Sequence, residues 1–242
     1  MKIIITAAGN GSRFKNQGIK KEKYQIIANE KTLFYWSLIS LKNFFEYEFI
    51  FIFQKENYEE EFVLNEIKNL GIKKYNIILL NQITDGQAST AIVASDLIQD
   101  NDPILIFNID THVNPESLEK NILKHDGCII TTQVPGNNWS FAKTNNDLFV
   151  EEVSEKNRIS NNASIGLYYF KKWKDFKDVY FKNKEDIKKK YKEVYICPMY
   201  QYLIESGKKI SIFDIAPKNF ICLGTPEQVF EFDKKWEKNN NK

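Results

Sequence analysis

The stretch KIIITAAGNGSRF, residues 2–14, decides how the rest of the chain is interpreted. Residues 3–5 are apolar without a two-residue period, which is typical of a strand covered by helices on both faces. Gly9 and Gly11 follow; they let the backbone approach a ligand closely, and successive N–H groups in such a loop can bind an anion. Arg13 adds a planar cation suited to phosphate oxygens. The stretch predicts a buried first strand and a phosphate-binding loop, with a plain strand-to-loop turn as the alternative.

Apolar runs of strand length alternate with longer amphipathic stretches through the first half of the chain. This alternation indicates β-α-β units, so we expect an α/β fold with a doubly wound, mostly parallel mixed sheet. The expected strands are residues 2–6, 49–53, 75–80 and 103–108. The expected helices are residues 33–44, 58–70 and 88–98.

After residue 124 the pattern changes to short strands separated by turns rich in Asn and Gly, expected at residues 128–133, 141–144, 148–153 and 164–170. Helices are expected at 172–181 and 197–206, the second ending at Gly207, and a last helix should begin at Thr225-Pro226-Glu227. No linker or repeat interrupts the chain. We therefore expect one domain over residues 1–242, with halves at 1–124 and 125–233 and a frayed tail at 234–242.

The composition excludes several classes of protein. The chain has 242 residues, 43% of them hydrophobic and 27% charged, which is typical of a globular protein. A net charge of +2 is too small to indicate a nucleic-acid partner, and no apolar stretch approaches the roughly 20 residues that cross a bilayer. Three widely spaced cysteines disfavour disulfides and zinc sites. We expect a cytoplasmic protein without nucleic-acid or membrane partners, and a homo-oligomer stays open.

Two charged residues should lie at the same sheet edge as the glycine loop. Lys23 belongs to a polar loop that begins at the carboxyl end of the first strand, where doubly wound sheets bind ligands. Asp110 follows the apolar strand 104–107, where a carboxylate could hold Mg²⁺ against phosphate oxygens. Alone, Lys23 fits a solvated surface and Asp110 a turn or a helix cap. His112 is expected as a polar lip of the cleft, since a single His supports no zinc site.

Together, Gly9, Gly11 and Arg13, then Lys23, then Asp110 resemble the sugar-phosphate nucleotidyltransferase family, which includes glucose-1-phosphate thymidylyltransferase and short cytidylyltransferases. Glu22 stands where the family usually has Pro, which affects the expected loop geometry. The resemblance implies the Rossmann-like nucleotide-diphospho-sugar transferase fold. It also implies that the first half binds the nucleotide, with Ala7, Ala8, Gly9, Asn10 and Gly11 in contact with it.

The resemblance continues to residue 227. Residues 82–88 are similar to the segment that contacts the base, which implies Gln82 and Gly86 as base contacts. The second half is similar to the family's acceptor-binding block, which implies as acceptor-binding residues Glu155, Lys156, Asn161, Gly166 and Tyr168. Trp139 and Tyr200 are further candidates for the acceptor pocket. Residues 223–227 resemble the Gly-Thr-Pro motif that opens the terminal helix.

One departure from the family concerns the metal. Many relatives have an Asp just before this last motif as a second metal contact, and here that position is Cys222. A thiol is a poor ligand for Mg²⁺, which favours oxygen donors. The resemblance therefore implies a Mg²⁺ cofactor held by Asp110 with phosphates and water, or with another carboxylate such as Asp214.

The implied reaction is transfer of a nucleoside monophosphate from CTP, UTP or dTTP to a sugar 1-phosphate or similar small phosphorylated acceptor, with release of pyrophosphate. Arg13 would grip the β- and γ-phosphates, Lys23 would bridge the attacking and α-phosphate oxygens, and Asp110 would position the metal. Relatives mostly activate building blocks for surface polysaccharides such as capsule.

Three alternatives stay open. The acceptor could be phosphocholine or a phosphorylated amino acid, or the chain could bind nucleotides as a regulator without turnover. A glycosyltransferase of the related fold usually has Asp-x-Asp where this chain has Asn108-Ile109-Asp110, with a single carboxylate.

Overall fold

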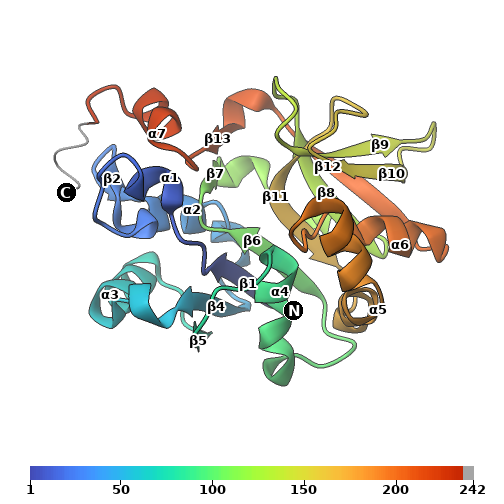
Figure 1. Cartoon of the computed structure of the whole chain (residues 1–242), viewed down its shortest axis with the longest axis horizontal. Helices are drawn as coiled ribbons and strands as arrows, with labels where there is room; N and C mark the ends of the chain where they lie inside the picture. Colours follow the sequence, from blue (N-terminus) through green and yellow to red (C-terminus); the bar gives the residue numbers. More distant parts are fainter. Residues whose placement is uncertain (237–242) are drawn as a thin grey trace.

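The apolar first strand, β1 (Lys2–Ala7), lies in the middle of a nine-stranded sheet in the computed structural model, which describes residues 1–236 (Figure 1). It pairs in parallel with β4 (Glu48–Gln54) on one side and with β6 (Ile104–Asn108) on the other. β5 (Tyr75–Leu80) extends the parallel part beyond β4. The expected α/β fold with a mostly parallel mixed sheet is confirmed.

The second half of the chain extends the same sheet beyond β6. β11 (Ala163–Phe170) runs antiparallel to β6 and also pairs with β8 (Gly127–Thr132), which in turn pairs in parallel with β12 (Ile210–Ile215). The hairpin of β9 (Ser140–Thr144) and β10 (Val150–Glu155) forms the outer end. Two further strand pairs join β2 (Ile27–Ala28) to β3 (Lys31–Thr32) and β7 (Thr111–Val113) to β13 (Phe220–Cys222).

Both faces of the sheet are covered, which explains the unbroken apolar run of β1. Ile4 packs in a cluster with α4 (Gln87–Ala91), α5 (Trp173–Tyr191) and α6 (Met199–Glu205). Ile3 and Ile5 point to the other face, toward α2 (Leu33–Ile39) and α3 (Glu60–Leu70). All three isoleucines are fully buried.

A third apolar cluster ties the two ends of the chain together. Phe14, from the short helix α1 (Ser12–Lys15), packs with Val229 of α7 (Pro226–Phe232) and with Trp236. The backbone N–H of Asn29 donates to the Asp233 carboxylate at 2.8 Å. The C-terminal helix therefore fixes the loop that follows β1.

Several sequence expectations need correction at their boundaries. The helix expected to end at residue 181 runs on to Tyr191, because Ile187 anchors the charged last turns in the core. The helices expected at 33–44 and 88–98 each change to 3-10 geometry, at Lys42–Phe44 and Ile92–Leu97. The expected frayed tail began at residue 234, but Trp236 is buried; residues 237–242 lie outside the described part.

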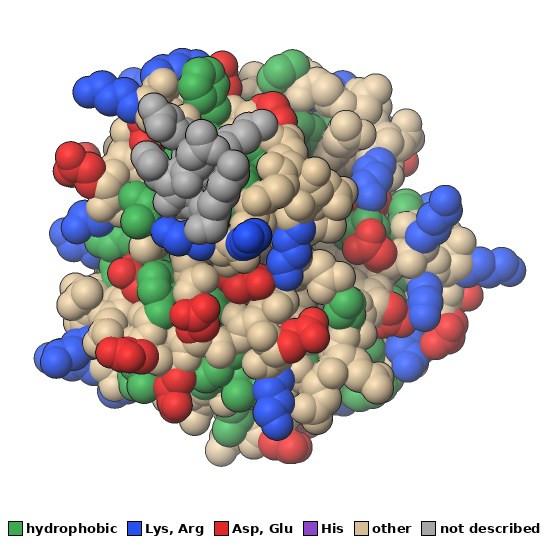
Figure 2. Space-filling view, turned by 60° about the vertical axis from the view of Figure 1, so that its left-hand side comes forward, with side chains coloured by type: hydrophobic (Ala, Val, Ile, Leu, Met, Phe, Trp, Pro, Cys, Tyr) green, Lys and Arg blue, Asp and Glu red, His purple; other side chains and the backbone are tan. Residues whose placement is uncertain are grey.

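Two observations concern nucleic-acid and membrane partners: the distribution of surface charge and the composition of the helices. On the face shown in Figure 2, Lys and Arg side chains are interspersed with Asp and Glu. Within residues 1–236, no helix combines the length and the apolar composition needed to span a membrane.

Candidate active site

A cavity of about 600 Å³ opens where β1, β4, β5 and β6 end. The glycine loop, Lys23, Asp110 and the segment from Ile83 to Thr90 form its walls. The cavity is thus lined by the predicted residues Ala7, Ala8, Gly9, Asn10, Gly11, Arg13, Lys23, Gly86 and Asp110.

The glycine loop presents open backbone to this cavity. A Cβ at Gly9 would meet nothing within 4 Å, so nothing separates that part of the backbone from a ligand. Gly11 has a left-handed conformation (φ 61°) at the start of α1, and Phe14 anchors this short helix in the core. Arg13 is exposed, with its guanidinium free to meet phosphate. The loop has the features that the sequence predicted for binding an anion.

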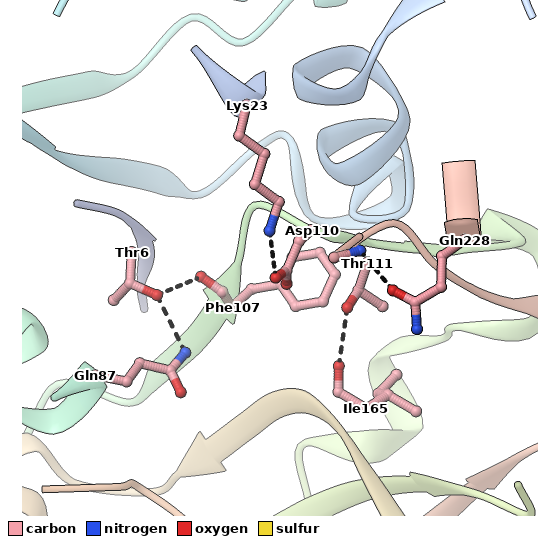
Figure 3. A network of polar contacts seen from close by, with 9 residues as sticks. Thr6, Lys23, Gln87, Phe107, Asp110, Thr111, Ile165 and Gln228 are labelled. Carbon is pink, nitrogen blue, oxygen red and sulfur yellow. Dashed lines mark hydrogen bonds and ion pairs between the residues drawn. The ribbon is translucent and has the colours of Figure 1, made fainter. Parts of the chain in front are cut away.

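Lys23 and Asp110 meet at the cavity wall, as Figure 3 shows: the ammonium nitrogen lies 2.5 Å from Asp110 Oδ2. Their side chains are 17% and 28% exposed. Lys23 begins a 3-10 turn (Lys23–Gln25) in which Glu22 and Gln25 form a reciprocal capping box. Glu22 has a φ of −61°, close to the value that a proline ring would impose, so the backbone at this position is one that Pro could also adopt.

Asp110 is held from the C-terminal side by Leu223 and Gly224. The Leu223 N–H donates to the Asp110 carbonyl at 2.8 Å. A Cβ at Gly224 would lie 3.4 Å from Asp110 Oδ2 and 3.6 Å from an Arg13 guanidinium nitrogen. Gln228 accepts a hydrogen bond from the Gly224 N–H at 3.0 Å. The Gly-Thr-Pro segment therefore closes the cavity beside Asp110, and Thr225 caps α7 as expected by accepting from the Gln228 N–H.

The residues around Asp110 fit a hard cation with one protein carboxylate. Burial, and then the negative charge of Asp110, raise the pKa of the Cys222 thiol, so Cys222 stays protonated. Asp214 hydrogen-bonds with Thr131 and does not line the cavity. The side-chain oxygen of Asn108 is buried without a hydrogen-bond partner, leaving an oxygen donor on the same strand end. No group of three His, Cys, Asp or Glu suited to a metal occurs within residues 1–236, so phosphates and water would supply the other ligands.

On the side of the predicted base contacts, Gly86 and Gln87 line the cavity and Gln82 does not. Gln82 is exposed, and its carbonyl accepts from the Gln54 amide at 3.3 Å. Gln87 instead reaches inward and donates to the Thr6 hydroxyl, which donates to the Phe107 carbonyl (Figure 3). Sequence reasoning missed Gln87, which is one residue beyond the predicted contact Gly86.

The predicted acceptor residues lie behind the cavity wall. Glu155 is buried and accepts a hydrogen bond from Ser140, and burial raises its pKa despite that bond and nearby Lys156. The Lys156 ammonium donates to the Tyr195 hydroxyl at 2.6 Å, and that hydroxyl donates to Glu193 at 2.8 Å. Glu193 lines the cavity, so it links this pair to the site. No motif in the sequence indicated Glu193.

Other predicted side chains lie outside the cavity. Tyr168 and Tyr200 are core residues, 4% and 0% exposed. Asn161 is at the surface beside Arg158. Gly166 (φ 81°) contacts Asn108. The expectation that His112 forms a lip of the cleft is wrong, because His112 does not line the cavity and its Nδ1 lies 2.9 Å from the Trp36 carbonyl.

A second, more apolar cavity of about 610 Å³ adjoins the first. The expected pocket residue Trp139 lies here, with its ring centre 5.9 Å from that of Phe220. Cys222 and Gln228 line the second cavity, and Gly224, between them in the chain, lines the first. The C-terminal segment therefore has one cavity on either side of it.

The fold and this site define an α/β protein with an anion-binding loop and a carboxylate at the carboxyl edge of its sheet. The nucleotidyl transferase family matches residues 2–239. A nucleoside-diphosphate-sugar pyrophosphorylase from Vibrio cholerae RC9 is 32% identical, with a TM-score of 0.88 over 97% of this chain and 100% of that one. The chain belongs to the nucleotidyl transferase family.

Two more distant structures share the fold. One is a putative glucose-1-phosphate thymidylyltransferase from Bacillus anthracis, 17% identical, with a TM-score of 0.76 over the whole of both chains. The other is the inositol-1-phosphate CTP transferase from T. maritima, 14% identical, with a TM-score of 0.73 over 97% of this chain and 95% of that one. A comparison with curated proteins found no match.

Proposed function

We propose that this protein transfers a nucleoside monophosphate from a triphosphate to a small phosphorylated acceptor and releases pyrophosphate. The observation that carries the proposal is the convergence of Arg13, Lys23 and Asp110 on one cavity beside the glycine loop. Two cations and one carboxylate on one wall suit a polyanion that binds with a metal ion. Membership of the nucleotidyl transferase family supports this class of reaction.

In this proposal catalysis comes from position and charge, with little covalent chemistry. An acceptor phosphate oxygen attacks the α-phosphorus as the bond to the bridging oxygen breaks, and pyrophosphate leaves. Residues 7–11 let the triphosphate lie against the backbone, and Arg13 holds its β- and γ-phosphates. Lys23 neutralises the charge that develops between the attacking and α-phosphate oxygens.

The proposed cofactor is Mg²⁺, which supplies charge neutralisation on the phosphates when it is bound. Asp110 would hold the ion, and its carboxylate is the hard oxygen donor that Mg²⁺ favours. For the base, Gly86 is joined by Thr84 and Gln87, which line the same cavity, while Gln82 would have to turn inward. CTP, UTP and dTTP are the proposed triphosphates.

For the acceptor we propose a sugar 1-phosphate that feeds the synthesis of a surface polysaccharide such as capsule. Glu155 and Lys156 offer one carboxylate for hydroxyl groups and one cation for phosphate, and Glu193 brings this pair to the cavity. Gly166 would act indirectly, because its lack of a side chain leaves room for Asn108. Tyr168 and Asn161 would also act indirectly, by supporting Glu155, Lys156 and Gly166 from outside the cavity.

A second candidate acceptor is a cationic phosphate such as phosphocholine or a phosphorylated amino acid. The adjoining apolar cavity favours it, because aromatic rings such as those of Trp139 and Phe220 attract a desolvated cation. Glu231 at the same cavity adds a carboxylate.

The test is pyrophosphate release with Mg²⁺, using five nucleoside triphosphates against sugar 1-phosphates, phosphocholine and phosphorylated amino acids. We expect release with one triphosphate and one class of acceptor. Lys23→Met should slow the release by about 10²–10³, while Lys20→Met, in the same loop but exposed and away from the cavity, should not slow it. Nucleotide binding without release from any pair would favour the regulator, and release of a nucleoside diphosphate from a nucleotide-sugar would favour the glycosyltransferase.

A further inference from the structure

Asp110 is surrounded by more positive than negative charge. The Lys23 ammonium nitrogen lies 2.5 Å from Asp110 Oδ2. The Arg13 guanidinium is also near, because it and the Asp110 carboxylate both lie next to Gly224. Among the other acids that line the cavity, Glu22 is paired with Lys15 at 3.1 Å and Glu193 accepts from Tyr195 at 2.8 Å. A free divalent cation that approaches Asp110 therefore meets a carboxylate already neutralised by an ammonium group.

The neighbouring side chains do not make up for this lost charge. Cys222, which pairs with Thr111 in the β13–β7 ladder, is half-buried and offers a sulfur atom instead of a carboxylate. Asp214 is bound to Thr131 away from the cavity. Within residues 1–236 Asp110 belongs to no group of three or more His, Cys, Asp or Glu side chains that could hold a metal. A metal ion would have to displace Lys23 from the single carboxylate without help from another protein charge.

A triphosphate changes this balance. Its oxygens carry several negative charges, they are hard ligands for a divalent cation, and they attract an ammonium group more strongly than one carboxylate does. Lys23 also lines the cavity beside the glycine loop, so its ammonium group can turn from Asp110 to a bound phosphate.

We propose that the site takes its metal only together with the triphosphate, because Lys23 occupies Asp110 until phosphate oxygens draw the ammonium away. Lys23 thus has two partners in turn: Asp110 in the free protein and the phosphates in the loaded one. The inference rests on the proposed function in one respect, that a triphosphate binds in this cavity.

The test is binding of Mn²⁺ alone to the full-length protein, followed by the electron paramagnetic resonance signal of free Mn²⁺. We expect the wild-type protein to bind Mn²⁺ weakly, and both Lys23→Met and Lys23→Gln to bind it on the order of tenfold more tightly, because they free the carboxylate. Lys20→Met should leave the affinity unchanged. Adding Asp110→Asn to either Lys23 variant should remove the gain.

A second arm repeats the titration with inorganic triphosphate present, and water-proton relaxation then reports Mn²⁺ bound in the ternary complex. The wild-type protein should bind Mn²⁺ tightly only in this arm, and the Lys23 variants should bind it in both arms. Equal affinity of wild-type and Lys23 variants for Mn²⁺ alone would overturn the inference. This measurement needs no turnover, so an active transferase that binds free Mn²⁺ tightly would refute the inference and leave the proposed function intact.

Discussion

Gly86 and Val194 lie so close that a Cβ on Gly86 would stand 2.5 Å from the Val194 backbone nitrogen. The two segments are hydrogen-bonded on either side of this contact: the Val194 N–H donates to the Asp85 carbonyl at 2.7 Å, and the Ala88 N–H donates to the Val194 carbonyl at 3.0 Å. An ion pair between Lys188 and Asp85 at 2.8 Å also connects the two segments. The connection between α5 and α6 is therefore part of the wall that carries the predicted base contacts.

Gly86→Ala should destabilise the protein and weaken nucleotide binding. The side chain would collide with backbone, which cannot move cheaply, and the φ of 140° at Gly86 is strained for any other residue. We expect the free energy of unfolding in urea to fall by about 1–3 kcal/mol. Gly71→Ala is the matched control, because Gly71 also has positive φ (78°) but nothing within 4 Å of its Cβ position. If the free energy of unfolding falls no more in Gly86→Ala than in Gly71→Ala, the backbone at Val194 can move to accommodate the added methyl group.

Lys23→Met and Arg13→Met should affect different kinetic constants. The contact of Lys23 with the phosphates strengthens further in the transition state, so we expect kcat to fall by about 10²–10³, a larger loss than the rise in the KM of the triphosphate. Arg13 binds phosphates that do not react, so its loss should mainly raise that KM. Steady-state kinetics on both variants separate these effects, and equal losses in kcat and KM for Lys23→Met would contradict its assignment.

The sequence predicted those parts of the molecule that depend on local pattern. The isoleucines of β1, the Thr225 cap and the position of Asp110 at the end of β6 follow from hydrophobic periodicity and capping chemistry, which act between neighbours in the chain. Strand β12 was missed, because the adjacent apolar residues Ile212 and Phe213 interrupt its two-residue alternation.

The site residues show the same limit. Glu193 reaches the cavity only because Val194 packs on Gly86, a tertiary contact that no local motif encodes. Gln82 and Gln87 are both glutamines in one loop, and the backbone turn at Gly86 decides which of them faces inward. Tyr168 matched the motif, but its strand alternation points it into the core.

Tyr195→Phe should impair use of the acceptor more than use of the triphosphate. The Tyr195 hydroxyl positions the Lys156 ammonium at 2.6 Å. We expect the KM of the acceptor to rise about tenfold, since one hydrogen bond to a charged group is lost, with the KM of the triphosphate unchanged. Tyr191→Phe, at the end of α5 and beside Lys190 instead, is the control. Similar changes in both KM values would indicate a general structural role.

Glu155→Gln should stabilise the protein at neutral pH while it raises the KM of the acceptor. Burial raises the pKa of Glu155, so the folded state binds its proton more tightly than the unfolded chain does. Ionisation therefore lowers stability as the pH rises from the unfolded pKa, about 4, through the folded one. Gln cannot ionise but can still accept the hydrogen bond from Ser140.

The stability gain of Glu155→Gln over wild type should be small at pH 4 and grow toward pH 7, as measured by urea unfolding at each pH. Glu152→Gln, an exposed change on the same strand, should show no such trend. A constant difference at every pH would mean that the buried carboxylate does not titrate as proposed. The expected result, greater stability at neutral pH together with a raised KM of the acceptor, would indicate that the charge of Glu155 serves binding at a cost in stability.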